Sequence, residues 1–257
     1  MSLPAYRVDG IDVRLASADG MRTVLRDVSF YVGTGEIVAV VGRSGVGKTT
    51  LMRTLGGLLA PSGGSVFLFG AAVHHPPPDV VTVFQDYTNA LLPWRTVAGN
   101  TALGLEGRIT RAERRHRVSH ALRMVGLGGH ESERPWQLSG GMAQRVQIAR
   151  ALALQPRVLL MDEPFGALDT ITKYALQDVL LDVHRQTDTT IVFITHDLDE
   201  AIYVSDRVLL MAGDPGTVTM TVTIDIPRPR DQVSTREVPF YLHVRHRLGE
   251  ALRAAYA

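Results

Sequence analysis

Cysteine is absent from the 257-residue chain, and neither sign of charge dominates, with 27 Lys and Arg against 26 Asp and Glu. Without cysteine there is no disulfide framework, no Cys-ligated metal and no thiol nucleophile, which suits a reducing compartment. The formal net charge of +1 removes the bulk electrostatic argument for a nucleic-acid partner. What remains is a globular protein of ordinary composition, long enough to bury a sizeable core.

Long hydrophobic runs are also missing. The longest apolar stretches, at 37–42 and 158–161, are far shorter than the roughly 20 residues that a membrane-spanning helix needs. The first ten residues lack a basic region followed by an apolar run, so we expect no secretory signal. Any membrane role is therefore expected to be peripheral.

The order of the apolar patterns predicts an α/β fold. Residues 7–32 alternate between apolar and polar side chains, which predicts strands with one solvent-facing side. Continuous apolar runs predict strands buried on both faces at 36–41, 158–161 and 190–195. Other strands are expected at 65–69, 80–84, 208–211 and 218–226, and helices at 49–59, 96–126, 142–154, 167–185, 198–204 and 240–255. This order indicates an N-terminal antiparallel β layer, a mainly parallel sheet and a helical subdomain inserted at about 90–155.

The segment Gly42–Thr49 fits the pattern G-x-x-x-x-G-K-[ST], between a predicted buried strand and a predicted helix. Glycines in such a loop let consecutive backbone N–H groups form a concave anion site, and the helix N-terminus adds positive potential. Lys48 can then reach the β- and γ-phosphates of a nucleotide, and the Thr49 hydroxyl can bind Mg²⁺. The residues expected to hold the nucleotide are Gly42, Ser44, Gly45, Gly47, Lys48, Thr49 and Thr50.

Two further positions are typical of nucleotide chemistry. Asp162 and Glu163 end a predicted buried strand; in P-loop proteins such an Asp holds Mg²⁺, and an acid directly after it can polarise an attacking water. Ser139 can cap a helix that starts at Gly140 and Gly141. This second turn is either a simple capped helix start or another phosphate site, which would serve the nucleotide of a second chain.

The complete set of motifs resembles the ATPase subunit of ABC transporters. The set consists of the phosphate loop, the Ser139 turn, the strand-end carboxylates, Gln85, Ala167–Asp169 and Thr195–Asp197. These motifs occur in the family's order and cover most of residues 7–225. The resemblance implies a P-loop NTPase core and ATP with Mg²⁺ as cofactors.

The resemblance also implies roles for individual residues. Gln85 would contact Mg²⁺ and the attacking water, Glu163 would be the general base, and His196 would contact the γ-phosphate. Asp169 would link the two sites of a head-to-tail dimer. Ser139, Gly140 and Gly141 would close on the ATP held by the opposite copy. The metal contacts would come from Thr49, Gln85 and Asp162.

A narrower resemblance is to importers of nitrate, sulfonate and taurine. It rests on Leu91–Val97, Met142, His196–Ala201 and Pro227–Asp231. Such importers take up a small anion or organic solute through an integral membrane permease that works with a solute-binding protein. The resemblance therefore implies a cytoplasmic ATPase that lies on the inner face of the cell membrane.

Several features leave alternatives open. The family's adenine-stacking aromatic has no counterpart between Ala16 and Met21, so Tyr6 or another residue would contact the base. Trp94 fits either core packing or a groove that receives a permease helix. The basic run Arg111–Arg117 fits a solvated helix face better than a nucleic-acid patch.

Residues 226–257 are expected to follow an ATPase domain of residues 1–225 as a linker and a helix. Pro227–Arg230 is predicted to be extended, and the helix after it to pack as an amphipathic tail rather than to bind a membrane surface. Two other functions stay open: a soluble ABC ATPase that acts on nucleic acid or ribosomes, and a nucleotide-responsive binding module with little turnover. Glu163 and His196 argue against the second.

Overall fold

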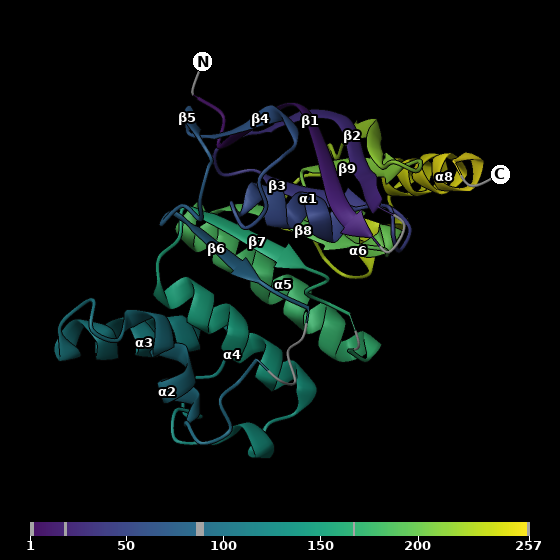
Figure 1. The fold of residues 1–257 in the computed structure, drawn as a ribbon. Coiled ribbons are helices and arrows are strands. Elements are labelled where there is room, and N and C mark those ends of the chain that lie inside the picture. The colour runs from purple at the N-terminus through teal and green to yellow at the C-terminus, as the bar shows by residue number, and fades with distance from the viewer. Residues whose placement is uncertain (1–2, 18–19, 86–89, 167, 256–257) are drawn as a thin grey trace.

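The computed structural model describes residues 3–17, 20–85, 90–166 and 168–255 (Figure 1). Its strands are β1 (Tyr6–Ser17), β2 (Gly20–Val32), β3 (Ile37–Val41), β4 (Gly63–Leu68), β5 (Ala71–Ala72), β6 (Val80–Val83), β7 (Val158–Asp162), β8 (Thr190–Thr195), β9 (Arg207–Ala212) and β10 (Thr217–Thr223). Its α-helices are α1 (Lys48–Leu55), α2 (Val97–Thr101), α3 (Arg111–Met124), α4 (Gly140–Ala153), α5 (Thr170–Thr187), α6 (Leu198–Val204), α7 (Ser234–Glu237) and α8 (Pro239–Ala254). Short 3₁₀ turns lie at Leu103–Leu105 and Pro135–Gln137.

The strands form two sheets in separate layers. In the described part of the chain, the N-terminal sheet is antiparallel with the order β2-β1-β4-β5, and its long β1–β2 hairpin pairs Tyr6 with Val32. The central sheet has the order β10-β9-β3-β8-β7-β6. Its strands β9, β3, β8, β7 and β6 run parallel, and β10 is antiparallel to β9. The predicted antiparallel layer and mainly parallel sheet are confirmed.

The register of the parallel strands brings their carboxyl ends to one edge. Val41 of β3 lies opposite Thr195 of β8, and Asp162 of β7 lies opposite Ile194 of β8. The strands β3, β7 and β8 are buried along their whole length, as their continuous apolar runs predict. The loops that follow these strands are therefore held side by side.

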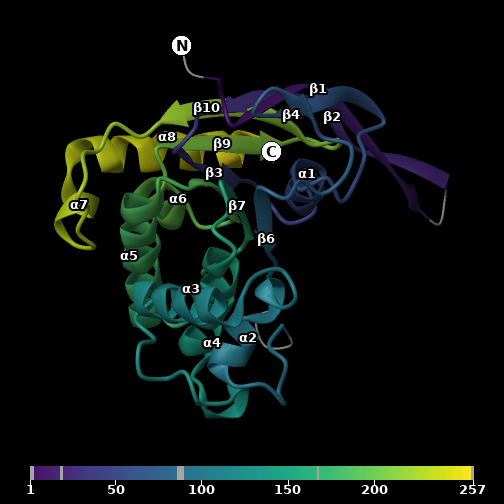
Figure 2. The same ribbon diagram turned by 90° about the vertical axis from the view of Figure 1, so that its left-hand side faces the viewer.

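Hydrophobic packing covers both faces of the central sheet. One core lies between the two sheets and encloses α1 through Leu51, Met52 and Leu55. The other core lies on the opposite face, where α5 and α6 pack and from which α2, α3 and α4 extend as a helical subdomain (Figure 2). Among the described helices, none is both long enough and apolar enough to cross a bilayer.

The helical subdomain departs from the single helical pattern predicted over 96–126. The chain forms the short helix α2, a 3₁₀ turn and then α3. The break follows from Gly107, whose φ of +74° lies in the left-handed region, and from Thr110, whose hydroxyl accepts a hydrogen bond from Glu113 N–H and caps α3. The predicted inward face of α3, including Val118 and Leu122, is buried.

The predicted linker before the C-terminal helix is anchored to α6. Arg230 is buried, and its guanidinium donates to the carbonyls of Tyr203 at 2.8 Å and Ser205 at 2.8 Å, at the end of α6. Farther on, α8 packs against α6 and contributes Tyr241 and Leu248 to the core on that face. The helix thus packs as the expected amphipathic tail. A domain boundary at residue 225 stays a prediction.

Arg207 at the start of β9 joins the two sheets. Its Nε and Nη2 each donate to Glu36 at 2.7 Å, and Nη2 also donates to the Tyr31 carbonyl of β2 at 2.6 Å. Only 8% of the Arg207 side chain is exposed. Losing the guanidinium would leave the partly buried Glu36 carboxylate without its counter-charge, which is expensive in a poorly solvated site.

We expect Arg207→Met to lower the free energy of unfolding by about 3 kcal/mol, as measured by urea denaturation. Arg22→Met is the matched control, because Arg22 forms an exposed pair with Asp214 at 2.9 Å and exposed pairs contribute little. Equal unfolding midpoints for the two variants would show that Arg207 does not hold the sheets together.

Candidate active site

The phosphate loop lies between β3 and α1, as predicted, at the edge where the parallel strands end. Gly47, directly before α1, has a φ of +102°, and a Cβ atom there would lie 2.6 Å from Leu25 Cδ2. Both the backbone conformation and the packing against β2 therefore require glycine. The loop borders a cavity of about 450 Å³, large enough for a small-molecule ligand.

The cavity gathers most of the predicted site residues. It is lined by Val24, Ser44, Gly45, Gly47, Lys48, Thr49, Thr50, Gln85, Glu163 and His196. Val24 of β2 is the lining residue that the sequence did not reveal; its only signal is that the β1–β2 hairpin precedes the loop. Because Val24 is apolar and packs beside Gly47, it offers a hydrophobic wall next to the phosphate loop.

Lys48 is buried under the loop. Its Nζ donates to the carbonyls of Gly42 at 2.6 Å and Arg43 at 2.9 Å, so the ammonium is held by the loop itself. Burial lowers the pKa of Lys48, while the charges of Glu163 and Asp162 act to raise it. The result is a fixed positive charge within the glycine-rich loop that precedes α1, an arrangement that suits phosphate binding.

Asp162 ends β7 beneath the loop and is buried. Burial raises the pKa of its carboxyl group, and a hydrogen bond with the Thr49 side chain opposes that rise. Among the described residues, no three His, Cys, Asp or Glu side chains form a metal cage. A hydroxyl and one carboxylate, completed by phosphate oxygens and water, are instead the donor set that suits Mg²⁺.

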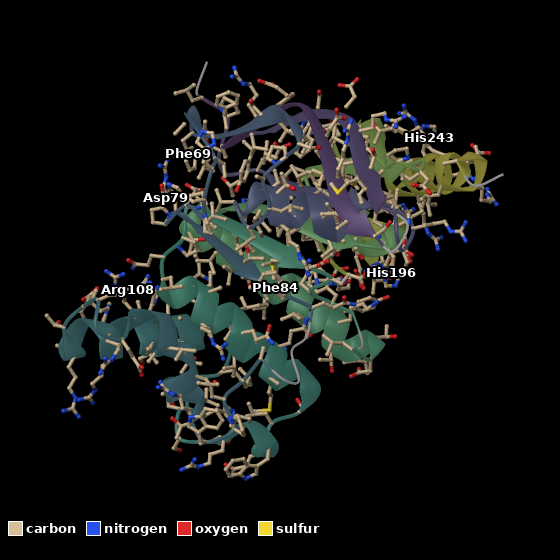
Figure 3. The ribbon with its side chains drawn as sticks, in the orientation of Figure 1. Phe69, Asp79, Phe84, Arg108, His196 and His243 are labelled. Carbon is tan, nitrogen blue, oxygen red and sulfur yellow. The ribbon has the colours of Figure 1, made fainter. Side chains whose placement is uncertain are left out.

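Glu163, Gln85 and His196 come together in the lining of the cavity. The Gln85 Nε2 donates to Glu163 Oε2 at 3.1 Å, and His196 Nδ1 lies 3.4 Å from the same oxygen. The three residues follow β6, β7 and β8, which the parallel register sets side by side. Figure 3 shows His196 at this edge of the sheet and Asp79, which precedes β6, toward the other end.

Glu163 also has a strained backbone. Its φ is +46°, in the left-handed region that a non-glycine residue enters at a cost of about 1 kcal/mol. Hydrogen bonds on both sides hold it there: its N–H donates to the Ile194 carbonyl at 3.1 Å, and its own carbonyl accepts from Gly166 N–H at 3.1 Å. Such strain is typical of a side chain that must point in one functional direction.

The remaining predicted residues lie outside this cavity. Ser139 caps α4, where its hydroxyl accepts from Met142 N–H at 3.2 Å. A Cβ atom on Gly141 would collide with the Thr172 side chain of α5, so packing alone already requires a glycine there. Asp169 caps α5 by accepting from the N–H groups of Ile171 and Thr172. Within the described chain, neither turn reaches the phosphate loop.

Two aromatic interpretations are resolved by burial. Tyr6 is fully buried and its hydroxyl donates to the Leu55 carbonyl at 2.9 Å, so Tyr6 as a base-stacking residue was wrong. Part of the segment Ala16–Met21 lies outside the described residues, as does Ala167. Trp94 is 68% exposed, which excludes the core-packing interpretation. Phe84, labelled in Figure 3 between the central sheet and the helical subdomain, is also exposed.

The site combines a phosphate loop, an Asp-Glu pair at a strand end and a carboxylate that Gln and His contact. This combination is typical of P-loop nucleotide triphosphatases. Comparisons with known proteins narrow this class. Residues 25–166 match the family described as ABC transporter. The nitrate transport protein NasD of Klebsiella oxytoca is 40% identical over 250 residues, which cover 95% of both chains.

Two further matches agree. The bicarbonate transport ATP-binding protein CmpD of Synechocystis sp. is 42% identical over 93% of this chain and 86% of its own. A dimeric solved structure of a post-hydrolysis state of the ATP-binding cassette MJ0796, bound to ADP and Pi, has a TM-score of 0.74. It is 29% identical and covers 86% of this chain and 100% of its own. The chain therefore belongs to the ABC transporter family and is an ATP-binding ATPase coupled to transport.

We expect Lys48→Met to reduce ATP hydrolysis by about 100-fold or more, because it removes a fixed charge aimed at the phosphates. ATP affinity, measured by fluorescence with a labelled nucleotide, should fall as well. The melting temperature should stay near that of the original chain, since the two hydrogen bonds described for the buried ammonium go to loop carbonyls. Unchanged affinity and turnover would remove Lys48 from the site.

Proposed function

We propose that this chain is the ATP-hydrolysing subunit that powers import of a small solute through a separate membrane permease. The observation that carries the proposal is the convergence of Gln85, Glu163 and His196 on one oxygen atom beside the Lys48 loop. This arrangement suits hydrolysis rather than storage of a nucleotide, because a carboxylate held near the phosphate can take a proton from water.

The proposed chemistry is attack by water on the γ-phosphate. Lys48 and the loop N–H groups would hold the β- and γ-phosphates, and Gly42, Ser44, Gly45 and Thr50 would complete the cradle. Thr49, Asp162 and Gln85 would hold Mg²⁺. The metal would neutralise charge that develops on the phosphate oxygens.

Glu163 is proposed as the general base. Its Oε2 is the atom shared by Gln85 and His196, so both neighbours orient the carboxylate toward the cavity. His196, whose side chain is 64% exposed at the edge of the sheet, would contact the γ-phosphate. Positioning of water between Glu163 and the phosphate would supply most of the rate gain.

The working unit is proposed to be a head-to-tail dimer. Ser139 and Asp169 lie at exposed helix starts outside their own chain's cavity, which leaves that cavity open on one side. In the dimer, Ser139, Gly140 and Gly141 of one copy would close on the ATP of the other. Asp169 would connect the two sites, and ATP hydrolysis would release them.

The proposed partner is an integral membrane permease, served by a solute-binding protein. Exposed Phe84, next to Gln85 in the chain, and exposed Trp94 offer apolar side chains for a permease helix. The subunit would then lie in the cytoplasm on the inner face of the membrane. Relatives named for nitrate and bicarbonate transport support a small anion as solute, within a class that includes nitrate, sulfonates and taurine.

We expect Glu163→Gln to lower the ATPase rate by about 100-fold or more, because an amide cannot accept the proton from water. The variant should still bind ATP and should be trapped as an ATP-bound dimer. A phosphate-release assay measures the ATPase rate. Light scattering measures the mass and so tests for the ATP-bound dimer.

Glu237→Gln is the matched control, since Glu237 is exposed in α7, away from the cavity. It should leave turnover, ATP affinity and oligomeric state unchanged. Residual turnover of Glu163→Gln close to that of the control would show that another group takes the proton.

Trp94→Ala tests the permease surface. Truncating a central interface tryptophan costs about 2 kcal/mol or more, so recruitment to membranes that contain the permease should weaken about 30-fold. Cosedimentation with such membranes measures this. Leu58→Ala removes a comparably exposed apolar side chain after α1 and should have no effect. Equal recruitment of the two variants would contradict a docking role for Trp94.

A further inference from the structure

Lysine occurs at only two positions in this chain, Lys48 and Lys173, whereas arginine occurs at 25. Lys48 belongs to the phosphate loop. Lys173 lies in the first turn of α5, outside the phosphate cavity, and the proposed function gives it no role. A signal specific to lysine side chains can therefore report on these two positions alone.

Lys173 holds a buried carboxylate. Its Nζ lies 2.7 Å from Glu200 Oε1 and 3.4 Å from Asp197 Oδ2. Only 5% of the Glu200 side chain is exposed, and its other oxygen accepts a hydrogen bond from the Thr195 hydroxyl. A carboxylate so far from water needs a counter-charge in fixed geometry. Burial lowers the pKa of Lys173, but bonding to Glu200 and the charge of Asp197 outweigh it, so the ammonium stays charged.

This cluster clamps the backbone on both sides of His196. Thr195, which donates to Glu200, also accepts a hydrogen bond from Asp197 N–H at 3.0 Å. Asp197 in turn caps α6, accepting from Asp199 N–H at 2.8 Å. His196 lies between these two anchored residues, so its side chain has a fixed origin from which to reach Glu163 Oε2.

The other end of Lys173 is tied to the Asp169 turn. Its backbone N–H donates to the Asp169 carbonyl at 2.9 Å, and the Asp169 carboxylate caps the same helix turn through Thr172 N–H at 3.0 Å. One residue thus connects the start of α5 to the loop after β8. The ion pair of Lys173 with Glu200 is short and partly buried, and the hydrogen bond from its N–H to Asp169 is also short. These contacts offer a path by which a displacement of the Asp169 turn would reach His196.

We propose that Lys173 is a positioning residue that sets the place of His196 through Glu200 and Asp197 and couples it to the Asp169 turn. The inference rests on the proposed ATPase function, because it gives His196 a reacting phosphate to contact. Lys173 itself touches neither nucleotide nor water in the reaction. Its effect would be on the chemical step and not on ATP binding.

Steady-state kinetics provide the first test. We expect Lys173→Met to lower kcat about tenfold or more, with KM and the ATP Kd changed by less than about threefold. Lys173→Arg should keep kcat within about threefold, since a guanidinium can bridge the two carboxylates. Arg245→Met is the control: Arg245 pairs with Asp199 on the same turn of α6 at 3.0 Å but is exposed, so kcat should not change.

A purely structural ion pair would give a different result. Lys173→Met would then lose thermal stability while kcat per folded molecule stayed at the original value. Equal falls in kcat for Lys173→Met and Arg245→Met would also overturn the proposal, because any disturbance of α6 would suffice.

A second test observes the unmodified chain and needs a variant only to assign the signals. With ¹³C at the lysine ε-carbon, the protein gives two side-chain NMR signals, assigned by the loss of one in Lys173→Arg. A non-hydrolysable ATP analogue with Mg²⁺ should shift both signals, although Lys173 lies outside the phosphate cavity. If only the Lys48 signal shifts, the coupling through Lys173 is wrong and ATP binding stands. If neither shifts, nucleotide binding and the proposed function fail together.

Discussion

The parallel register of β3, β8, β7 and β6 is the constraint on which the rest of the structure depends. These strands are paired so that Val41 lies opposite Thr195, Asp162 opposite Ile194, and Val83 opposite Met161. A slip of one residue would turn every side chain to the other face of the sheet and so disrupt the packing of both hydrophobic cores. The loops that carry the reactive side chains inherit that precision.

The chemistry follows from where these strands end. A phosphate loop follows β3, two carboxylates follow the apolar part of β7, and a histidine follows β8. Each of these loops alone is an ordinary strand end. Held at one edge together with the segment after β6, they bring Gln85 and His196 to a single oxygen of Glu163, in the cavity that Lys48 also lines. The left-handed backbone of Glu163 shows that the surrounding hydrogen bonds direct this side chain at some cost.

Much of this arrangement could be predicted from the sequence, because it depends on local sequence patterns. Continuous apolar runs indicated the buried strands, and the spacing of glycines before Lys48 indicated the phosphate loop. Features that depend on distant contacts could not be predicted. Burial of Tyr6 depends on Leu55, and burial of Arg230 depends on carbonyls at the end of α6. The split of the 96–126 pattern depends on how Gly107 and Thr110 end one helix and start the next.

The Lys173 cluster shows the same limit of sequence reasoning. No motif marks Lys173, Glu200 and Thr195 as a unit; they come from different elements, and folding alone makes them one buried ion-pair cluster. It connects the turn that caps α5 to the turn that carries His196. The Ser139 turn and the Asp169 turn both lie outside their own cavity. In the proposed dimer, a second copy completes each nucleotide site.

The most direct test of that central claim is the ATPase rate of a mixture of two inactive variants. Lys48→Met breaks the phosphate loop. Ser139→Asp keeps a good helix cap but puts a carboxylate where the partner's γ-phosphate would lie. In a head-to-tail dimer of one copy of each, both defects fall in one site and the other site is intact. Random pairing therefore predicts recovery of about a quarter of the original rate. A mixture no more active than its separate components would contradict a site shared between two copies.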